Sequence, residues 1–169
     1  LNGDGYYSGG RKGFLDKYNL HTGLKTRIFE SDDTLAQEDI SMVINAEKRI
    51  LLTLIQDSHT YPSFYLRSLH DNTLQQITFY KNPFLALQGV KQEIIRYRRN
   101  DGTELSARLY IPLNHDGVTK LPLIMWAYPM EFKDQQTAGQ STNGKHDFIY
   151  PFWGSPLYWV AKGYAIMDD

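Results

Sequence analysis

The first half of the chain alternates apolar and polar residues in short runs, which predicts β-strands rather than helices. Residues 14–20 and 24–29 form two such runs around a polar turn, and residues 64–69 and 74–79 do the same. Two runs of this length with a short polar segment between them are typical of a hairpin. We therefore expect two hairpins, which repeat at a spacing of about 50 residues.

The segment between the hairpins predicts two more strands, at residues 40–46 and 49–56. Four short strands per period of about 50 residues are typical of a β-propeller blade. The alternative is two unrelated hairpins that share polar turns. Residues 1–10 are rich in turn formers, so we expect no strand there and the chain would begin inside a blade.

The pattern changes in the second half, where residues 81–89 predict a linker. Residues 92–99 and 103–111 then flank Asn100-Asp101-Gly102. Asp-Gly between β-rich runs is a strong hairpin signal, because the favoured turn needs positive φ. Apolar and polar residues alternate over 105–111, so we expect this hairpin to have one face in solvent.

An almost uncharged run extends from Leu121 to Pro129. Residues 123–127 leave no polar face, which predicts a strand covered on both sides, as in a parallel sheet between helices. Pro129 cannot donate to a sheet and restricts the residue before it. The strand should end at Tyr128, and ligands gather at the carboxyl ends of strands in open α/β sheets.

A short helix and another strand are predicted near the end of the chain. Ser155 and Pro156 supply a helix N-cap and a first-turn proline, and Gly163 supplies the stop after residues 157–162. Residues 164–167 begin the next strand. A hairpin, a buried strand, a helix and a second buried strand are the order in which an α/β-hydrolase sheet opens.

Such a sheet would be unfinished, because two parallel strands and one helix cannot cover both faces. Burying a large apolar side chain contributes about 1.5–3 kcal/mol, and a typical domain is stable by only about 5–15 kcal/mol. We therefore expect a piece of a longer polypeptide, or a chain that other chains complete.

Composition narrows the classes of function. A net charge of −1 over 169 residues gives no electrostatic support for binding nucleic acid or a membrane surface, and no apolar run is long enough for a membrane helix. The absence of cysteine excludes disulfides and thiolate chemistry but leaves the compartment open, periplasmic or secreted as well as cytoplasmic. The 12 tyrosines, 8 phenylalanines and 3 tryptophans favour a β-rich fold.

Several stretches resemble the prolyl oligopeptidase family of serine peptidases, specifically its glutamyl endopeptidase branch. The more specific pieces are Ala-Tyr-Pro-Met-Glu-Phe-Lys, at residues 127–133, and Ala-Gly-Gln, at residues 138–140. Residues 95–112, residues 161–168 and the last predicted blade, which ends at residues 74–83, are also similar. The resemblance covers most of the chain from about Ile40 onward.

The resemblance implies a mixed fold, in which β-propeller blades precede the opening strands of an α/β-hydrolase sheet. Residues 1–83 would be the last one and a half blades and residues 84–91 a linker. Residues 92–169 would be the N-terminal part of the peptidase domain, truncated before the nucleophile. Both domains would be incomplete.

The resemblance also implies that the parent protein hydrolyses oligopeptides by Ser-His-Asp acyl transfer, with a propeller that controls access. In the family, a tyrosine after the first buried hydrolase strand donates its hydroxyl to the oxyanion, and Tyr128 occupies the matching position. The alternative role for Tyr128 is to plug the edge of the sheet. The expected partners are a peptide substrate and the remainder of the same polypeptide; no metal or organic cofactor is expected. Without the triad, this stretch should be inactive alone.

Two alternatives to this function stay open. One is a non-catalytic propeller and hydrolase-like binding protein, and the other is a dipeptidyl or acylaminoacyl peptidase of the same family. Met130 and the segment Ser141-Thr142-Asn143 depart from the residues expected in relatives. The cleavage preference therefore stays open too.

Other candidate residues are weaker. Ser141 nearly completes a Gly-x-Ser-x-Gly motif, but Asn143 replaces the second glycine and no strand precedes it, so we expect a loop. Asp168 and Asp169 end a predicted strand, and we expect them to serve as turn residues or to support the site. The five histidines lack metal-ligand spacing and are expected in surface turns: His21, His59, His70, His115 and His146.

Overall fold

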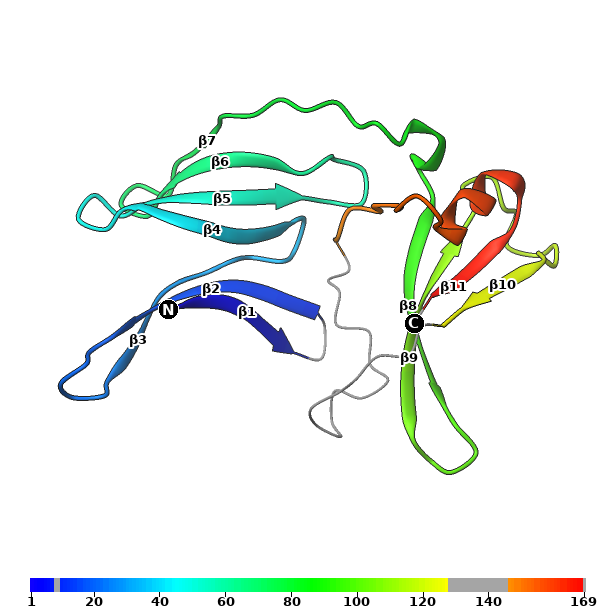
Figure 1. Ribbon diagram of the computed structural model, residues 1–169, viewed down its shortest axis with the longest axis horizontal. Helices are drawn as coiled ribbons and strands as arrows, with labels where there is room; N and C mark the ends of the chain where they lie inside the picture. The colour runs from blue at the N-terminus through cyan, green and yellow to red at the C-terminus, as the bar shows by residue number, and fades with distance from the viewer. Residues whose placement is uncertain (8–9, 128–145, 169) are drawn as a thin grey trace. The chain divides into compact units, whose positions relative to one another are not determined.

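The computed structural model describes residues 1–7, 10–127 and 146–168, which form two compact units (Figure 1). The first unit comprises Leu1–Asn82 and His146–Phe148, and the other described residues form the second. The described residues form three β-sheets and two short 3-10 helices, so the predicted β-rich fold is confirmed. None of the helices in these residues is long and apolar enough to cross a membrane.

The first sheet of unit 1 is an antiparallel meander of β1 (Asn2–Tyr7), β2 (Gly10–Tyr18) and β3 (Lys25–Glu30). The predicted hairpin is confirmed as β2 and β3, whose turn contains Gly23 at a φ of 71°. The prediction that no strand forms near the N-terminus is wrong, because β1 pairs with β2 along its whole length.

Backbone pairing and an aromatic ring explain β1 despite its composition. Gly3 lies over the ring of Phe14 on β2, where an added Cβ would lie 3.4 Å from the ring edge. Aromatic side chains that cover glycines on a neighbouring strand stabilise such pairs. Tertiary context therefore outweighs the low intrinsic β-propensity of this segment.

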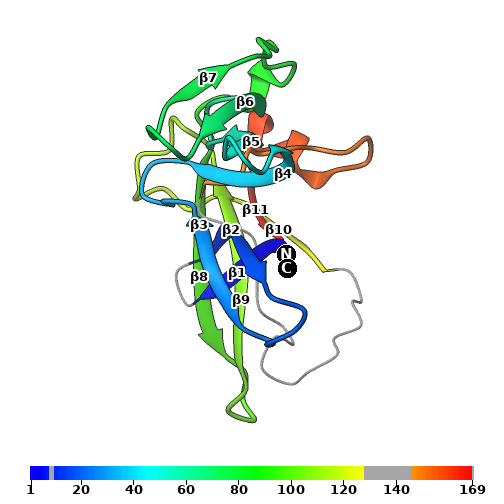
Figure 2. The same ribbon diagram turned by 90° about the vertical axis from the view of Figure 1, so that its left-hand side faces the viewer.

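The second sheet of unit 1 contains the two predicted middle strands and the second predicted hairpin. Its strands are β4 (Gln37–Asn45), β5 (Ile50–Gln56), β6 (Ser63–Ser68) and β7 (Leu74–Gln76), in that order (Figure 2). All neighbours are antiparallel. Asn72 turns the β6–β7 hairpin at a φ of 56°, a conformation that asparagine tolerates better than most residues.

The two sheets of unit 1 approach each other closely. A Cβ added at Gly13 of β2 would lie 2.5 Å from the carbonyl oxygen of Glu38 on β4, so only glycine fits there. Arg67 of β6 donates two hydrogen bonds, of 2.6 and 2.7 Å, to the buried carboxylate of Glu38. The guanidinium of Arg67 also lies 5.4 Å from the centre of the Phe29 ring on β3. One cation therefore contacts both sheets.

In unit 2, β8 (Lys91–Arg98) and β9 (Glu104–Ile111) form the hairpin predicted around Asp101-Gly102. Gly102 has a φ of 88°, and Asp101 accepts a hydrogen bond from the amide of Thr103. The sheet continues through β11 (Ala165–Asp168) to β10 (Leu123–Trp126), in the order β10-β11-β9-β8. The strands β10 and β11 are parallel.

Two 3-10 helices belong to unit 2: η1 (Leu85–Leu87) and η2 (Pro156–Lys162). The predicted caps of η2 are confirmed. The side chain of Ser155 accepts a hydrogen bond from the amide of Leu157, and Gly163 ends the helix at a φ of 88°. The core of the unit lies between η2 and the sheet, and consists of Leu87, Val90, Tyr110, Ile149, Leu157, Val160 and Ile166.

One sequence expectation about exposure is wrong, and another is not tested by the described residues. On β9, Ser106 and Tyr110 are buried as well as Ala107, because the face expected in solvent carries Tyr110, which belongs to the core with Leu157 and Val160 of η2. Within the described residues β10 is an edge strand with exposed side chains, which agrees with the expectation that two parallel strands and one helix cannot cover both faces of the sheet. It pairs only with β11, and Met125 keeps 68% of its surface exposed.

Candidate functional site

The parallel pair of strands in unit 2 ends at Trp126 of β10 and Asp168 of β11, which face each other in the register. We call these two strand ends the carboxyl edge. Trp126 is 41% exposed, so this end of the sheet is accessible in the described residues. Because reacting groups in open α/β sheets gather at such an edge, it is the best candidate site that the fold offers.

A charged pair lies at the carboxyl edge. Arg108 of β9 faces Asp168 in the antiparallel register, and its Nη2 donates a hydrogen bond of 3.4 Å to Asp168 Oδ2. The guanidinium also lies 6.0 Å from the centre of the Tyr110 ring. Both charged side chains are 23% exposed, so each is partly screened from water. Asp168 is therefore part of an ion pair, and the supporting role expected from the sequence stays a prediction.

The residue predicted to act at this edge, Tyr128, lies outside the described residues, as do Ser141 and Asp169. In sequence, Tyr128 follows the last residue of β10 by two positions. The described strand therefore ends next to the predicted residue in the sequence, and the role of Tyr128 stays a prediction.

The histidines are only partly as expected. His21, His59 and His70 are exposed in turns, which confirms that prediction, whereas His115 and His146 are half-buried. The described residues contain no group of three or more histidine or acidic side chains arranged to hold a metal ion.

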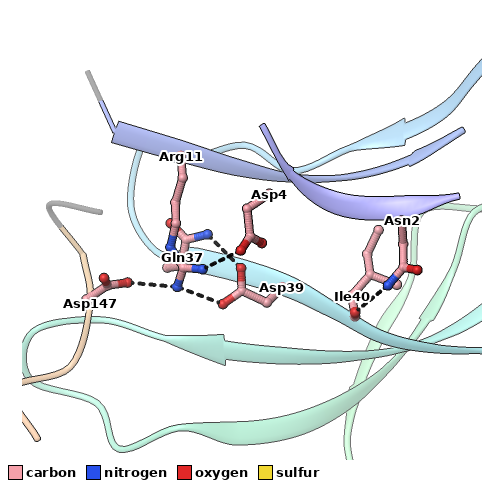
Figure 3. A network of polar contacts seen from close by, with 7 residues as sticks. All are labelled: Asn2, Asp4, Arg11, Gln37, Asp39, Ile40 and Asp147. Atoms are coloured by element: carbon pink, nitrogen blue, oxygen red, sulfur yellow. Dashed lines mark hydrogen bonds and ion pairs between the residues drawn. The ribbon is translucent and has the colours of Figure 1, made fainter. Parts of the chain in front are cut away.

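A second polar cluster lies in unit 1, and the sequence did not predict it. Arg11 of β2 is surrounded by three carboxylates at 3.1–3.2 Å, those of Asp4, Asp39 and Asp147 (Figure 3). Gln37 donates a hydrogen bond of 2.9 Å to Asp39. We call these five residues the Arg11 cluster. Its members are scattered along the sequence without a motif, so no signal could have grouped them.

The charges of the Arg11 cluster do not balance, because one guanidinium faces three carboxyl groups. Burial alone would lower the pKa of Arg11, but Asp147, Asp39 and Asp4 outweigh burial and raise it. Burial raises the pKa of Asp39, and Asp4 and Asp147 add to this effect, whereas the hydrogen bond from Gln37 and the charge of Arg11 oppose it. The guanidinium of Arg11 lies between the three carboxylates and therefore neutralises part of their charge.

The Arg11 cluster also anchors the segment 146–148 within unit 1. Next to Asp147, the amide of Phe148 donates a hydrogen bond of 3.2 Å to Gln56 Oε1. The Phe148 ring is buried and meets the ring of Tyr61 edge-on, with centroids 5.2 Å apart. An ion pair, a hydrogen bond and a ring contact therefore hold Asp147 and Phe148, which are distant in sequence from the rest of their unit.

A scan against protein-family models finds no match. Two curated proteins are similar over 178 aligned residues, which cover 99% of this chain. Both are described as probable chloroplastic glutamyl endopeptidases. The protein from Oryza sativa subsp. japonica is 34% identical and the one from Arabidopsis thaliana 33%. The chain spans only 19% and 18% of their lengths.

Solved structures show the same fold at lower sequence identity. Oligopeptidase B from Trypanosoma brucei matches 98% of this chain with a TM-score of 0.58 and 11% identity, over 22% of its own length. The AtxE2 isopeptidase matches 97% of this chain with a TM-score of 0.53 and 18% identity, also over 22% of its length. The strand pattern of this chain thus occurs within larger peptidases.

Proposed function

We propose that this chain, which belongs to the prolyl oligopeptidase family of peptidases, is part of a serine peptidase that hydrolyses oligopeptides by Ser-His-Asp acyl transfer. The likeness of 99% of the chain to proteins described as glutamyl endopeptidases supports the reaction class. The observation that carries the proposal is the parallel pair β10 and β11, in which β10 ends two residues before Tyr128 in the sequence.

Apart from the segment 146–148 of unit 1, the two units are proposed to belong to two domains. The sheets β1–β3 and β4–β7 would be blades of a propeller, over residues 1–83, which controls the access of peptides. Residues 84–91 would link them to the peptidase domain, which begins at residue 92 and whose α/β-hydrolase sheet opens with β8 to β11. The antiparallel meanders and the mixed sheet order β10-β11-β9-β8 support this division.

Tyr128 is proposed to donate its hydroxyl to the oxyanion of the tetrahedral intermediate. A hydrogen-bond donor aimed at developing charge in a site that excludes water is among the largest contributions to acyl transfer. The remaining donor and the triad would come from other parts of the polypeptide. Chemistry of this type needs neither a metal nor an organic cofactor.

Labelling of the full-length protein with a fluorophosphonate probe tests the reaction class. We expect one serine to be labelled, and labelling to be blocked when the protein is first incubated with a peptide aldehyde that occupies the active site. Heat-unfolded protein is the control and should not be labelled. If the folded protein is not labelled, the chain is part of a non-catalytic binding protein instead.

A further inference from the structure

A pocket of about 410 Å³ in unit 1 is lined by residues from both of its sheets. Sites for small molecules commonly have about 300–1,000 Å³, so this pocket has the size of a ligand site. Its wall is aliphatic and contains Leu15, Ile28, Val43, Leu51 and Leu69. The described residues that line the pocket include no aromatic side chain on which a flat ring could stack, so the wall suits an alkyl chain.

The charged residues that line this pocket leave two positive charges open to a ligand. The carboxylate of Asp16 lies 2.5 Å from Arg27 Nε and 3.7 Å from Lys25 Nζ, and its side chain is only 1% exposed. Its charge is therefore offset within unit 1 and is closed to a ligand. Lys17 and Arg49 are exposed lining residues, and neither forms an ion pair with another described residue. The two unpaired cations favour an anion at the pocket.

Arg49 has a backbone conformation that is unfavourable for arginine, with a φ of 55° in the β4–β5 turn. Two other hairpin turns of unit 1 have Gly23 and Asn72 in this left-handed region. Glycine and asparagine tolerate the conformation, whereas a longer side chain is strained there. The amide of Leu69 donates a hydrogen bond of 3.0 Å to the carbonyl oxygen of Arg49 and holds this backbone beside the pocket. Strained residues of this kind are concentrated at sites that bind ligands.

We propose that this pocket binds an aliphatic carboxylate, whose alkyl chain packs against the aliphatic wall and whose head binds Arg49 and Lys17. The guanidinium of Arg49 has the planar fork that matches a carboxylate. Burial of the alkyl chain stabilises the complex in proportion to the apolar area that leaves water. All lining residues belong to unit 1, so this inference does not rest on the proposed peptidase function.

Two other properties of the pocket would give different binding. If the pocket bound ligands through its apolar wall alone, the charge of the head group would not matter. If the cations acted alone, the length of the alkyl chain would not matter. Only a site that uses both parts requires a long chain and a negative head.

Titration calorimetry of the full-length protein separates these cases. Decanoate is compared with butyrate, which shortens the chain, and with decyltrimethylammonium, which reverses the charge, each below the concentration at which it forms micelles. We expect decanoate to bind with a Kd below about 1 mM and the other two at least about tenfold more weakly. Equal affinity for either of them, or no binding of decanoate, would overturn the inference.

Arg49→Gly assigns the binding to this pocket. It removes the cation and gives the turn a residue that suits its conformation, so the fold of unit 1 is preserved. We expect the Kd for decanoate to rise about tenfold, the effect of losing one hydrogen-bonded charge. Lys48→Gln, which removes the neighbouring cation outside the lining, is the matched control and should change the Kd less than about twofold. An unchanged Kd in Arg49→Gly, or an equal rise in both variants, would contradict the assignment.

Discussion

Asp147 and Arg11 lie 136 positions apart in the sequence and form an ion pair of 3.1 Å within unit 1. The pair is mostly shielded from solvent, since the Arg11 side chain is 17% exposed and that of Asp147 is 13% exposed. Arg11 also forms ion pairs with Asp4 and Asp39. Its loss would therefore leave three carboxyl groups without their shared cation.

Arg11→Met should destabilise unit 1 by about 2–4 kcal/mol, because removal of one partner from a buried ionic cluster leaves uncompensated charge. Hydrogen exchange of β2 and β4, followed by mass spectrometry in the full-length protein, measures this. Lys17→Met, which removes an exposed cation from the same strand, is the matched control and should change little. Equal protection in both variants would show that the Arg11 cluster contributes nothing to stability.

The contributions of Asp39 and Asp57 to the stability of unit 1 should change with pH in opposite directions. Burial raises the pKa of Asp39 above its ordinary value of 3.8, so the folded state binds more protons than the unfolded state just above that value. The contribution of Asp39 to stability is therefore lost as the pH rises through the pKa that Asp39 has in the folded state. In Asp39→Asn this loss of stability on going from acid to neutral pH should be smaller.

For Asp57, burial opposes ionisation, but hydrogen bonds from His59 and Thr60 outweigh it and lower the pKa. Its contribution is present above pH 3.8 and is lost as the pH falls through the folded pKa. Asp57→Asn should therefore destabilise unit 1 at neutral pH and have little effect in acid. Exchange rates of β4–β6, measured against pH and corrected for intrinsic exchange, test both signs. A change of the same sign in the two variants would contradict these assignments.

Gly13→Ala should destabilise unit 1 by about 1–3 kcal/mol, because the new methyl group meets the backbone oxygen of Glu38 at 2.5 Å and the two sheets must separate. Gly3→Ala is the control. Within the part of the chain that the structure describes, its methyl group would meet the ring of Phe14 alone, at 3.4 Å, and should be tolerated. Exchange protection of β2 and β4 distinguishes the two variants, and equal effects would contradict the close approach of the sheets.

Gly163→Ala should weaken the end of η2 by about 1 kcal/mol, because a φ of 88° is unfavourable for a residue with a side chain. Among the described residues, apart from the chain neighbours of Gly163, no atom lies within 4 Å of the added methyl group, so we expect an effect of backbone strain. Gly163→Asn should lose less, since asparagine tolerates this conformation better. Local exchange of residues 157–164 gives the measurement; a larger loss for asparagine than for alanine would rule out strain.

Local chemistry made parts of the fold predictable. The cap at Ser155, the stop at Gly163 and the turn at Asp101-Gly102 each depend on a few adjacent residues, and the structure has all three. Strand β1 was missed, because its stability comes from pairing with β2 and from Phe14 rather than from its own composition. The Arg11 cluster depends on four segments that only folding brings together.

The candidate site was predictable to a smaller extent. An uncharged run ending in proline correctly indicates a strand and its carboxyl end. It does not reveal which strands pair with it, so the edge position of β10 and the alignment of Arg108, Asp168 and Trp126 required the sheet order. The role of Tyr128 came from resemblance and stays a prediction.

The turnover of Tyr128→Phe in the full-length protein tests the central proposal most directly. Loss of one oxyanion donor typically lowers kcat by about 10²–10³, and we expect that loss with KM changed by less than about threefold. Tyr97→Phe, which removes the hydroxyl of an exposed tyrosine on β8, is the control and should match the wild type. A kcat for Tyr128→Phe within about threefold of the wild type would contradict the assignment of this hydroxyl to the oxyanion.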